Sequence, residues 1–218
     1  MRHFTDTYER NAYTVSAKEV GMRAMIDSNG STWKAITAGT GAANWQPVAY
    51  KEILISLNSL REVTSGGDPG NVAAHGGLLA SDTTPILRGD AAETLEVAWA
   101  AGNSDIVGFQ TRLPDDLDDG QDVLIDLDVL TDNAGGGGIE AATFTVETGW
   151  DGGALVSDTA TDATPAITLH TITATVAAAD VPASPKVLTC MLTLGTHAND
   201  PVQLLGIRIR YFPKAPTP

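Results

Sequence analysis

The fold is decided by two stretches, Val123-Leu124-Ile125-Asp126-Leu127-Asp128-Val129 and Leu204-Leu205-Gly206-Ile207-Arg208-Ile209-Arg210-Tyr211-Phe212. In the first, apolar side chains alternate with two aspartates. In the second, they alternate with two arginines. A period of two with one polar face is typical of a strand in an antiparallel sheet that has one buried side. Both stretches therefore predict strands that cover a core.

The same kind of pattern recurs along the chain from residue 84 onward. Gly, Pro, Asn and Asp residues separate the apolar runs and predict turns between short strands. The predicted strands are Thr84–Leu87, Thr94–Ala100, Ile106–Leu113, Val123–Thr131, Ala142–Thr148, Ala154–Ser157, Thr168–Ala177, Lys186–Leu194 and Val202–Phe212. So many strands without a helical period predict an all-β fold, an antiparallel β-sandwich that is most simply a jelly roll. The order of the strands in the sheets is not readable from the pattern.

The chain upstream of residue 84 has a different character. Residues 1–50 predict an N-terminal arm or small β-element, and residues 51–83 a connecting segment that leads to a sandwich domain over 84–218. Residues 51–60 are compatible with a strand or with a short helix. Trp33 and Trp45 lie in a short Gly-rich piece and need a surface to pack on, either within one chain or between subunits.

Composition excludes several classes of partner. The 218 residues include 13 Lys and Arg against 27 Asp and Glu, a formal charge of −14. Nucleic acid and anionic membranes are disfavoured because their phosphates would be repelled. We expect no signal peptide at residues 1–6 and no membrane span, so the chain should fold in a cytoplasm. Cys190 lies in an apolar run and predicts a buried structural thiol.

The sequence offers few residues in the patterns that catalysis or metal binding requires. A triad needs a nucleophile, a base and an orienting acid that meet in space. The histidines His3, His75, His170 and His197 are scattered and lie near neither a nucleophile motif nor the single cysteine. They also lack the short spacings of zinc ligands. We therefore expect no enzyme activity, no metal and no cofactor.

Two further motifs have ordinary explanations. The run from 114 to 122 holds five Asp residues, and such oxygen-rich loops sometimes bind Ca²⁺. It lacks the EF-hand spacing, so a solvated acidic loop is preferred and calcium is the alternative. Arg88-Gly89-Asp90 matches an integrin-binding tripeptide but predicts a turn, and Gly135 to Gly138 predict a hairpin tip.

Sugar chemistry is an alternative that the residues leave open. Asp126, Asp128 and Glu147 lie on predicted strands, and glycosidases use two carboxylates across a cleft. Trp99 and Trp150 are candidates for stacking on a sugar ring. A lectin-like site would need two or more such aromatic rings coplanar on one exposed sheet face, and Trp150 first predicts a strand end that enters a tight turn.

Several segments resemble structural proteins of tailed phages. These segments are 31–41, 80–90, 99–103, 109–116 and 143–150. The resemblance is to capsid decoration proteins, also called cement or head-fibre proteins. It implies a non-catalytic virion component on the capsid surface, made in the host cytoplasm, that binds the major capsid protein and itself as a homotrimer.

The N-terminal arm is the part that we expect to hold the capsid. Its candidate contacts to the capsid or to another subunit are Phe4, Tyr13, Trp33 and Trp45. Three such arms in a trimer would multiply a contact that is marginal alone. The alternative functions are a carbohydrate-binding module and a fibre or tail adaptor module of a phage particle.

Overall fold

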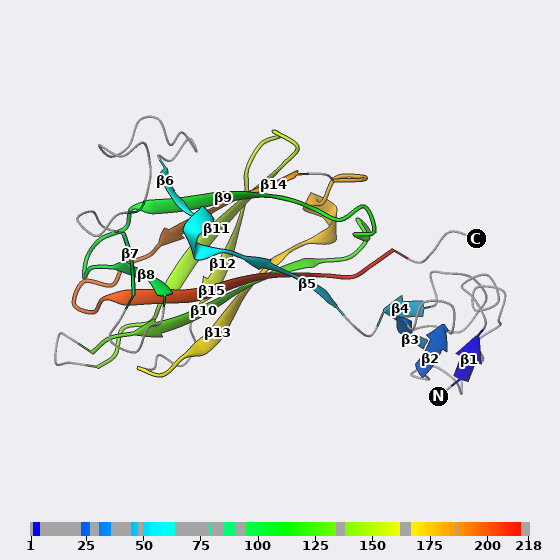
Figure 1. Ribbon diagram of the computed structural model, residues 1–218, viewed down its shortest axis with the longest axis horizontal. Helices are drawn as coiled ribbons and strands as arrows, with labels where there is room; N and C mark the ends of the chain where they lie inside the picture. The colour runs from blue at the N-terminus through cyan, green and yellow to red at the C-terminus, as the bar shows by residue number, and fades with distance from the viewer. Residues whose placement is uncertain are drawn as a thin grey trace.

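The computed structural model places fifteen strands in the part of the chain that it describes (Figure 1). The described residues are 2–4, 23–26, 31–35, 45–47, 50–63, 79, 85–89, 95–133, 138–161, 167–185 and 187–214. Within these ranges no helix is long and apolar enough to cross a membrane.

Each strand predicted beyond residue 84 has a counterpart in the structure, with bounds that shift by up to four residues. The counterparts are β7 (Ile86–Gly89), β8 (Leu95–Trp99), β9 (Ile106–Arg112), β10 (Val123–Thr131), β11 (Thr143–Trp150), β12 (Val156–Thr161), β13 (His170–Val176), β14 (Val187–Leu194) and β15 (Val202–Tyr211). They form two antiparallel sheets that lie as layers in Figure 1. The all-β sandwich is therefore the fold of this chain.

Each sheet takes strands from distant parts of the sequence. Sheet I has the order β13-β10-β15-β8-β7, and sheet II has the order β12-β11-β14-β9-β6. Two strands come from the segment expected to be a connection: β5 (Lys51–Ile55), which pairs with β15, and β6 (Arg61–Val63), which pairs with β9. A short 3₁₀ turn, η2 (Leu57–Ser59), carries the chain from one sheet to the other.

The strand pairs are nested, as in a jelly roll. The hairpin β11–β12 is the innermost pair. Along the sequence it is enclosed in turn by the pairs β10–β13, β9–β14 and β8–β15. Successive pairs alternate between the two sheets. This arrangement is a long ribbon of paired strands rolled over itself, so the jelly-roll prediction holds.

The core lies between the two sheets and contains the inward half of each alternating strand. Trp99 of sheet I is fully buried, and its ring meets Phe144 of sheet II edge to face, with 5.5 Å between ring centroids and an interplanar angle of 74°. The Trp99 indole Nε1 donates to the carbonyl oxygen of Asp105 at 2.9 Å. Its one polar group is therefore satisfied, and the pair ties the two layers together.

The N-terminal part forms a separate small sheet of backbone pairs. It consists of β1 (Arg2–Phe4), β2 (Arg23–Ile26), β3 (Ser31–Ala35) and β4 (Trp45–Pro47), in that order. β1 pairs with β2 in parallel, and the other two pairings are antiparallel. A β-element was expected for residues 1–50.

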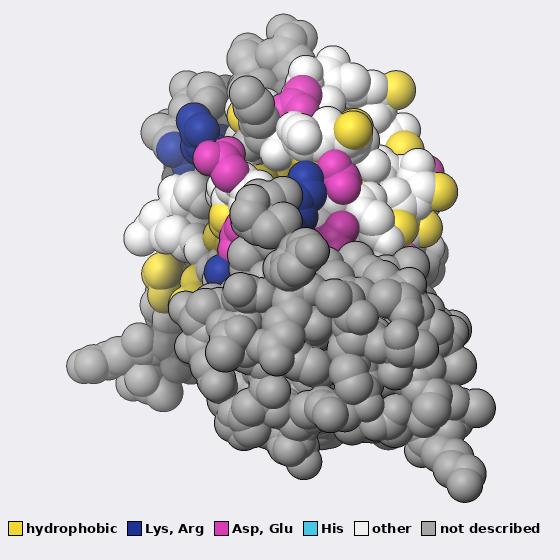
Figure 2. All heavy atoms as spheres, turned by 90° about the vertical axis from the view of Figure 1, so that its right-hand side faces the viewer, with side chains coloured by type: hydrophobic (Ala, Val, Ile, Leu, Met, Phe, Trp, Pro, Cys, Tyr) yellow, Lys and Arg dark blue, Asp and Glu magenta, His cyan; other side chains and the backbone are white. Residues whose placement is uncertain are grey.

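The junction between this N-terminal part and the sandwich is held on two sides. The Tyr50 ring packs on Phe212, with 4.1 Å between centroids, and the Arg210 guanidinium lies 5.0 Å from the Tyr50 ring. Lys51 Nζ pairs with a carboxylate oxygen of Asp116 at 2.5 Å. Figure 2 views this end of the molecule and shows acidic side chains beside Lys and Arg side chains on its described surface. These contacts bind the start of β5 to the end of β15 and to the acidic loop.

Among the described residues, one oxygen of an inward-facing carboxyl lacks a hydrogen-bond partner. Asp158 lies opposite Val146 on the core side of β12, and its Oδ2 is buried with no hydrogen-bond partner among the described residues. Burial raises the pKa of Asp158, and the neighbouring charge of Asp180 raises it further. The ionised form is therefore disfavoured in the folded protein.

We expect Asp158→Asn to raise the free energy of unfolding by about 1 kcal/mol at pH 7, because it removes a partly buried charge without changing the shape. A raised folded-state pKa means that the penalty is absent at acid pH and grows as the pH rises through that pKa. The gain should therefore vanish below the ordinary value of 3.8. Denaturant melts across pH measure it, with the exposed Asp115→Asn as the control; an equal gain at every pH would contradict it.

Candidate functional site

The described histidines serve the fold. His197 is 1% exposed; its Nδ1 lies 2.7 Å from the carbonyl oxygen of Gly195 and its Nε2 lies 3.1 Å from that of Ala100. His170 Nδ1 lies 2.9 Å from a backbone carbonyl oxygen of Thr168. The side chains of His3 and His75 lie outside the described residues. The contacts of His197 hold the turn after β8 against the turn after β14.

The carboxylates of the acidic loop bind separate structural partners. Asp116 accepts from Tyr211 as well as from Lys51, and Asp119 accepts from the backbone N–H of Ser184 and from Lys214. The hydrogen bond from Ser184 is the main cause of the lowered pKa of Asp119. Burial first, and then Asp116, raise the pKa of Tyr211 to about 12. Across the described ranges no three His, Cys, Asp or Glu side chains gather in a way that could hold a metal ion.

The carboxylates considered for sugar hydrolysis lie on opposite faces of the sandwich. Asp126 and Asp128 project from the outer face of sheet I, whereas Glu147 projects from the outer face of sheet II. Glu147 therefore cannot share a cleft with either aspartate. A glycosidase mechanism that pairs Glu147 with Asp126 or Asp128 is excluded, because the two carboxylates must flank one substrate.

Asp126 is also committed to a structural ion pair. Arg210 donates to both of its oxygens, at 2.6 and 2.8 Å, and Thr173 donates at 2.7 Å. Burial alone would raise the pKa of Asp126, but these donors hold it below its usual value. Arg208 bonds Asp128 at 3.1 Å on the same face. These pairs join β10, β13 and β15 side by side.

The tryptophans proposed for sugar stacking are buried. Trp99 is 0% exposed and Trp150 is 6% exposed, and both point into the core. A lectin-like platform built on these two rings is therefore wrong. The side chains of Phe4, Tyr13, Trp33 and Trp45 lie outside the described residues, although the backbones of Phe4, Trp33 and Trp45 belong to β1, β3 and β4.

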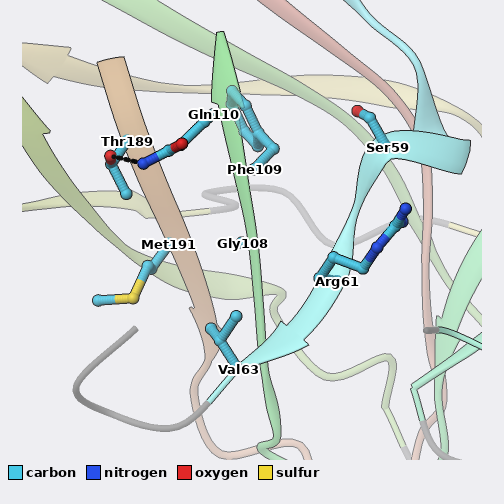
Figure 3. Close-up of a pocket in the computed structure, with 8 residues that line it drawn as sticks. All are labelled: Ser59, Arg61, Val63, Gly108, Phe109, Gln110, Thr189 and Met191. Carbon is cyan, nitrogen blue, oxygen red and sulfur yellow. Dashed lines mark hydrogen bonds between the residues drawn. The ribbon is translucent and has the colours of Figure 1, made fainter. Parts of the chain in front are cut away.

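A hollow on the outer face of sheet II is the best candidate for a binding site. It encloses about 330 Å³ between β14 on one side and η2 with β6 on the other, and β9 runs along its floor (Figure 3). Gly108 lies at the centre of that floor. A Cβ atom there would meet the carbonyl oxygen of Cys190 at 3.3 Å and Val63 at 3.4 Å, so a side chain at this position would be crowded by β14 and β6.

Amide, hydroxyl and guanidinium groups line the hollow. Gln110 Nε2 donates to Thr189 Oγ1 at 2.9 Å, and both side chains stand on the β14 side of the hollow (Figure 3). On the other side the Arg61 guanidinium donates to the carbonyl oxygens of Asn58 and Leu60, at 3.0 and 2.7 Å. Ser59 lies above it on η2. None of the eight described residues that line the hollow carries a carboxylate.

Apolar groups complete the lining. Val63 and Met191 stand at the lower end of the hollow, and both are buried (Figure 3). Phe109 borders the hollow from the core side. Such a mixture of apolar surface with a few placed amide, hydroxyl and guanidinium groups is suited to a small polar ligand.

Sequence reasoning did not select this site. The alternating pattern over 106–112 does place Gly108 and Gln110 on the face opposite Val107 and Phe109. The other half comes from 59–63, and only the register Arg61↔Gly108 brings that segment to β9. No local pattern encodes this pairing across more than forty positions.

Solved structures similar to this chain include carbohydrate-binding modules and a phage tailspike domain. A xylan-binding module, CBM15, matches with a TM-score of 0.48 and 16% identity over 77% of this chain and 100% of that one. A family 30 carbohydrate-binding module matches with a TM-score of 0.41 and 12% identity over 74% and 99%. The enzymatically active domain of bacteriophage CBA120 tailspike protein 4 matches with a TM-score of 0.34 and 9% identity over 73% and 19%.

No protein-family model and no curated protein matches the sequence. At these identities the likeness concerns the two-sheet fold alone.

Proposed function

We propose that this chain is a non-catalytic binding module of a phage particle, and that the hollow on sheet II binds a hydroxyl-rich ligand such as a glycan. The observation that carries the proposal is the lining of the hollow, which brings Gln110, Thr189 and Arg61 together around Gly108. The assignment to a phage particle rests on the resemblance of the sequence segments to phage structural proteins.

The chemistry of the lining favours a neutral polyhydroxylated ligand. Amide and guanidinium groups donate to hydroxyl and ring oxygens, and the Gln110 amide oxygen and the Thr189 hydroxyl accept from hydroxyl groups. The formal charge of −14 repels polyanions from the whole surface. A site without stacked aromatic rings should bind one ligand weakly, so many copies on one particle would supply the avidity.

The test is a glycan array followed by titration calorimetry with the best neutral oligosaccharide. We expect Gln110→Ala to weaken binding of the ligand about five- to tenfold, because the variant lacks the amide that would donate to and accept from the ligand. Gln203→Ala, the same change on the outer face of sheet I, is the matched control and should bind like the parent protein. Absence of any glycan binding, or equal binding by Gln110→Ala, would refute the proposal.

Capsid decoration is a second candidate, and the layout of the N-terminal part favours it. The described strands β1 to β4 pair only with one another, and the sandwich is complete without them. Leu54, just after the junction, is 74% exposed on sheet I and offers an apolar contact. A grip through residues 1–50 and a trimeric assembly would place the sandwich outward from the capsid.

Deletion of residues 1–45 tests this second candidate. We expect the shortened chain to lose co-sedimentation with undecorated capsids, and the full chain to have the mass of a trimer in solution. Undiminished co-sedimentation of the shortened chain would refute the grip. Glycan binding by the sandwich would be unchanged in either case.

A further inference from the structure

The strand β13 forms one edge of sheet I and lies along the lower border of the sandwich in Figure 1. Its backbone pairs with β10 and with no other described strand. Backbone groups on its far side are therefore a template for another strand, and proteins commonly block such an edge with charged side chains, a proline or a very short strand. β13 is seven residues long and contains neither a proline nor any Lys, Arg, Asp or Glu.

The other described edge strands of sheets I and II all carry charge. The charged residues are Asp158 in β12, Arg88 in β7, Lys51 and Glu52 in β5, and Arg61 and Glu62 in β6. β6 and β7 are also short, with three and four residues. By contrast, the sequence has no charged residue from 163 to 179. Within the described part of the sandwich, β13 is thus the edge that no charge protects.

The partner that fits this edge is β13 of a second copy, in antiparallel orientation. With a formal charge of −14 on each chain, two copies repel one another over most of their surface, whereas this stretch brings no charge into the contact. An antiparallel alignment centred on Thr173 places that residue opposite itself and Ile172 opposite Ala174. Leu169, which is more than half exposed, then lies opposite the exposed Ala177. Each larger side chain meets a smaller one.

The edge is held in place before any partner arrives. All seven residues of β13 are in register with β10. On the outer face, Thr173 also donates to Asp126 at 2.7 Å and Thr171 donates to Asp128 at 2.5 Å. Association therefore needs little further ordering of the strand, which lowers its entropic cost.

We infer that β13 is a self-association edge, through which two copies join their sheets I into one continuous antiparallel sheet across a two-fold axis at Thr173. The contact is small, so the pair forms reversibly and needs a high local concentration of the chain. The hollow lies toward the β6 end of sheet II, whereas β13 lies beside β12 at the other end, so both copies keep the hollow open. Pairing through β13 does not involve residues 1–50 and adds to any assembly that those residues form.

Sedimentation equilibrium of the full chain over a wide range of concentrations tests the inference. We expect the mass of the particle to double as the concentration rises. Thr173→Lys brings two like charges face to face at the axis, while its ammonium can pair with Asp126 of its own chain, so it should weaken association about tenfold. Leu169→Lys should act in the same direction. Thr159→Lys, at an exposed threonine on the charged edge β12, is the matched control and should associate like the parent protein.

Cross-linking tests the two-fold axis directly. Thr173→Cys places a thiol opposite its own copy, and the native Cys190 is fully buried and does not compete. Under mild oxidation this variant should form a covalent dimer faster than Thr159→Cys.

Three results would overturn the inference: a mass that does not change with concentration, an association that both lysine variants leave intact, or equal cross-linking by the two cysteine variants. Thermal melts show whether each variant keeps its fold. Glycan binding by the hollow is measured separately, so failure of the edge pairing leaves the proposed function in place.

Discussion

Replacing Asp126 with alanine is expected to lower the free energy of unfolding by about 3 kcal/mol or more. The carboxylate is 3% exposed, and Arg210 donates to both of its oxygens. Its removal leaves Arg210, which is about three-quarters covered, without its closest anion. It also removes a second anion, 3.9 Å away, from Arg208, which keeps its closer partner Asp128. Urea denaturation followed by tryptophan fluorescence would measure the change.

Asp128→Ala is the matched control for this result. Asp128 faces the same way from the same strand but is 25% exposed, and it accepts single bonds from Arg208 and Thr171. We expect its removal to cost about 1 kcal/mol. Equal losses for the two variants would show that the network on sheet I does not depend on the buried carboxylate.

Replacing Trp99 with alanine is expected to cost about 3 to 5 kcal/mol, because it opens a large cavity between the sheets. Trp99 has no exposed surface, and it contacts Phe144 across the core. The change also leaves the carbonyl oxygen of Asp105 without its donor. Calorimetric melting would measure the loss as a lower Tm.

Trp99→Phe separates the packing from the hydrogen bond. It keeps an aromatic ring opposite Phe144 but cannot donate to Asp105, so the cost should fall to about 1 to 2 kcal/mol. The exposed Leu54→Ala should change stability by less than about 0.5 kcal/mol. A small effect of Trp99→Ala would contradict the view that this ring joins the two layers.

Much of this fold could be predicted from sequence because each strand beyond residue 84 has one apolar face, and turn residues separate the strands. The alternation in 123–129 and 204–212 is local, and each strand could be recognised by itself. The nested order of the strands and the pairing of β5 with β15 are set by contacts between distant residues. Residues 51–60 remained ambiguous for that reason, and they form a strand followed by a 3₁₀ turn.

The candidate site was predictable only in part. Trp150 was a candidate for sugar stacking because it is an aromatic residue near a turn. The alternation of side chains along β11 instead places it on the core side, with Phe144. The acidic loop suggested calcium because its charges are adjacent in sequence, whereas in space they point to different partners. The hollow has no conspicuous residue type, since a glycine and two short strands from remote segments create it.

The junction has a mechanical consequence. β5 and β15 are antiparallel, with Lys51 opposite Tyr211 and Ile55 opposite Ile207. If residues 1–50 are fastened to a particle while sheet II holds a surface, tension enters the sandwich along β5. A pull directed along β5 would load all five registered residue pairs together in shear instead of one after another, so we expect this attachment to resist more force than a terminal strand that peels.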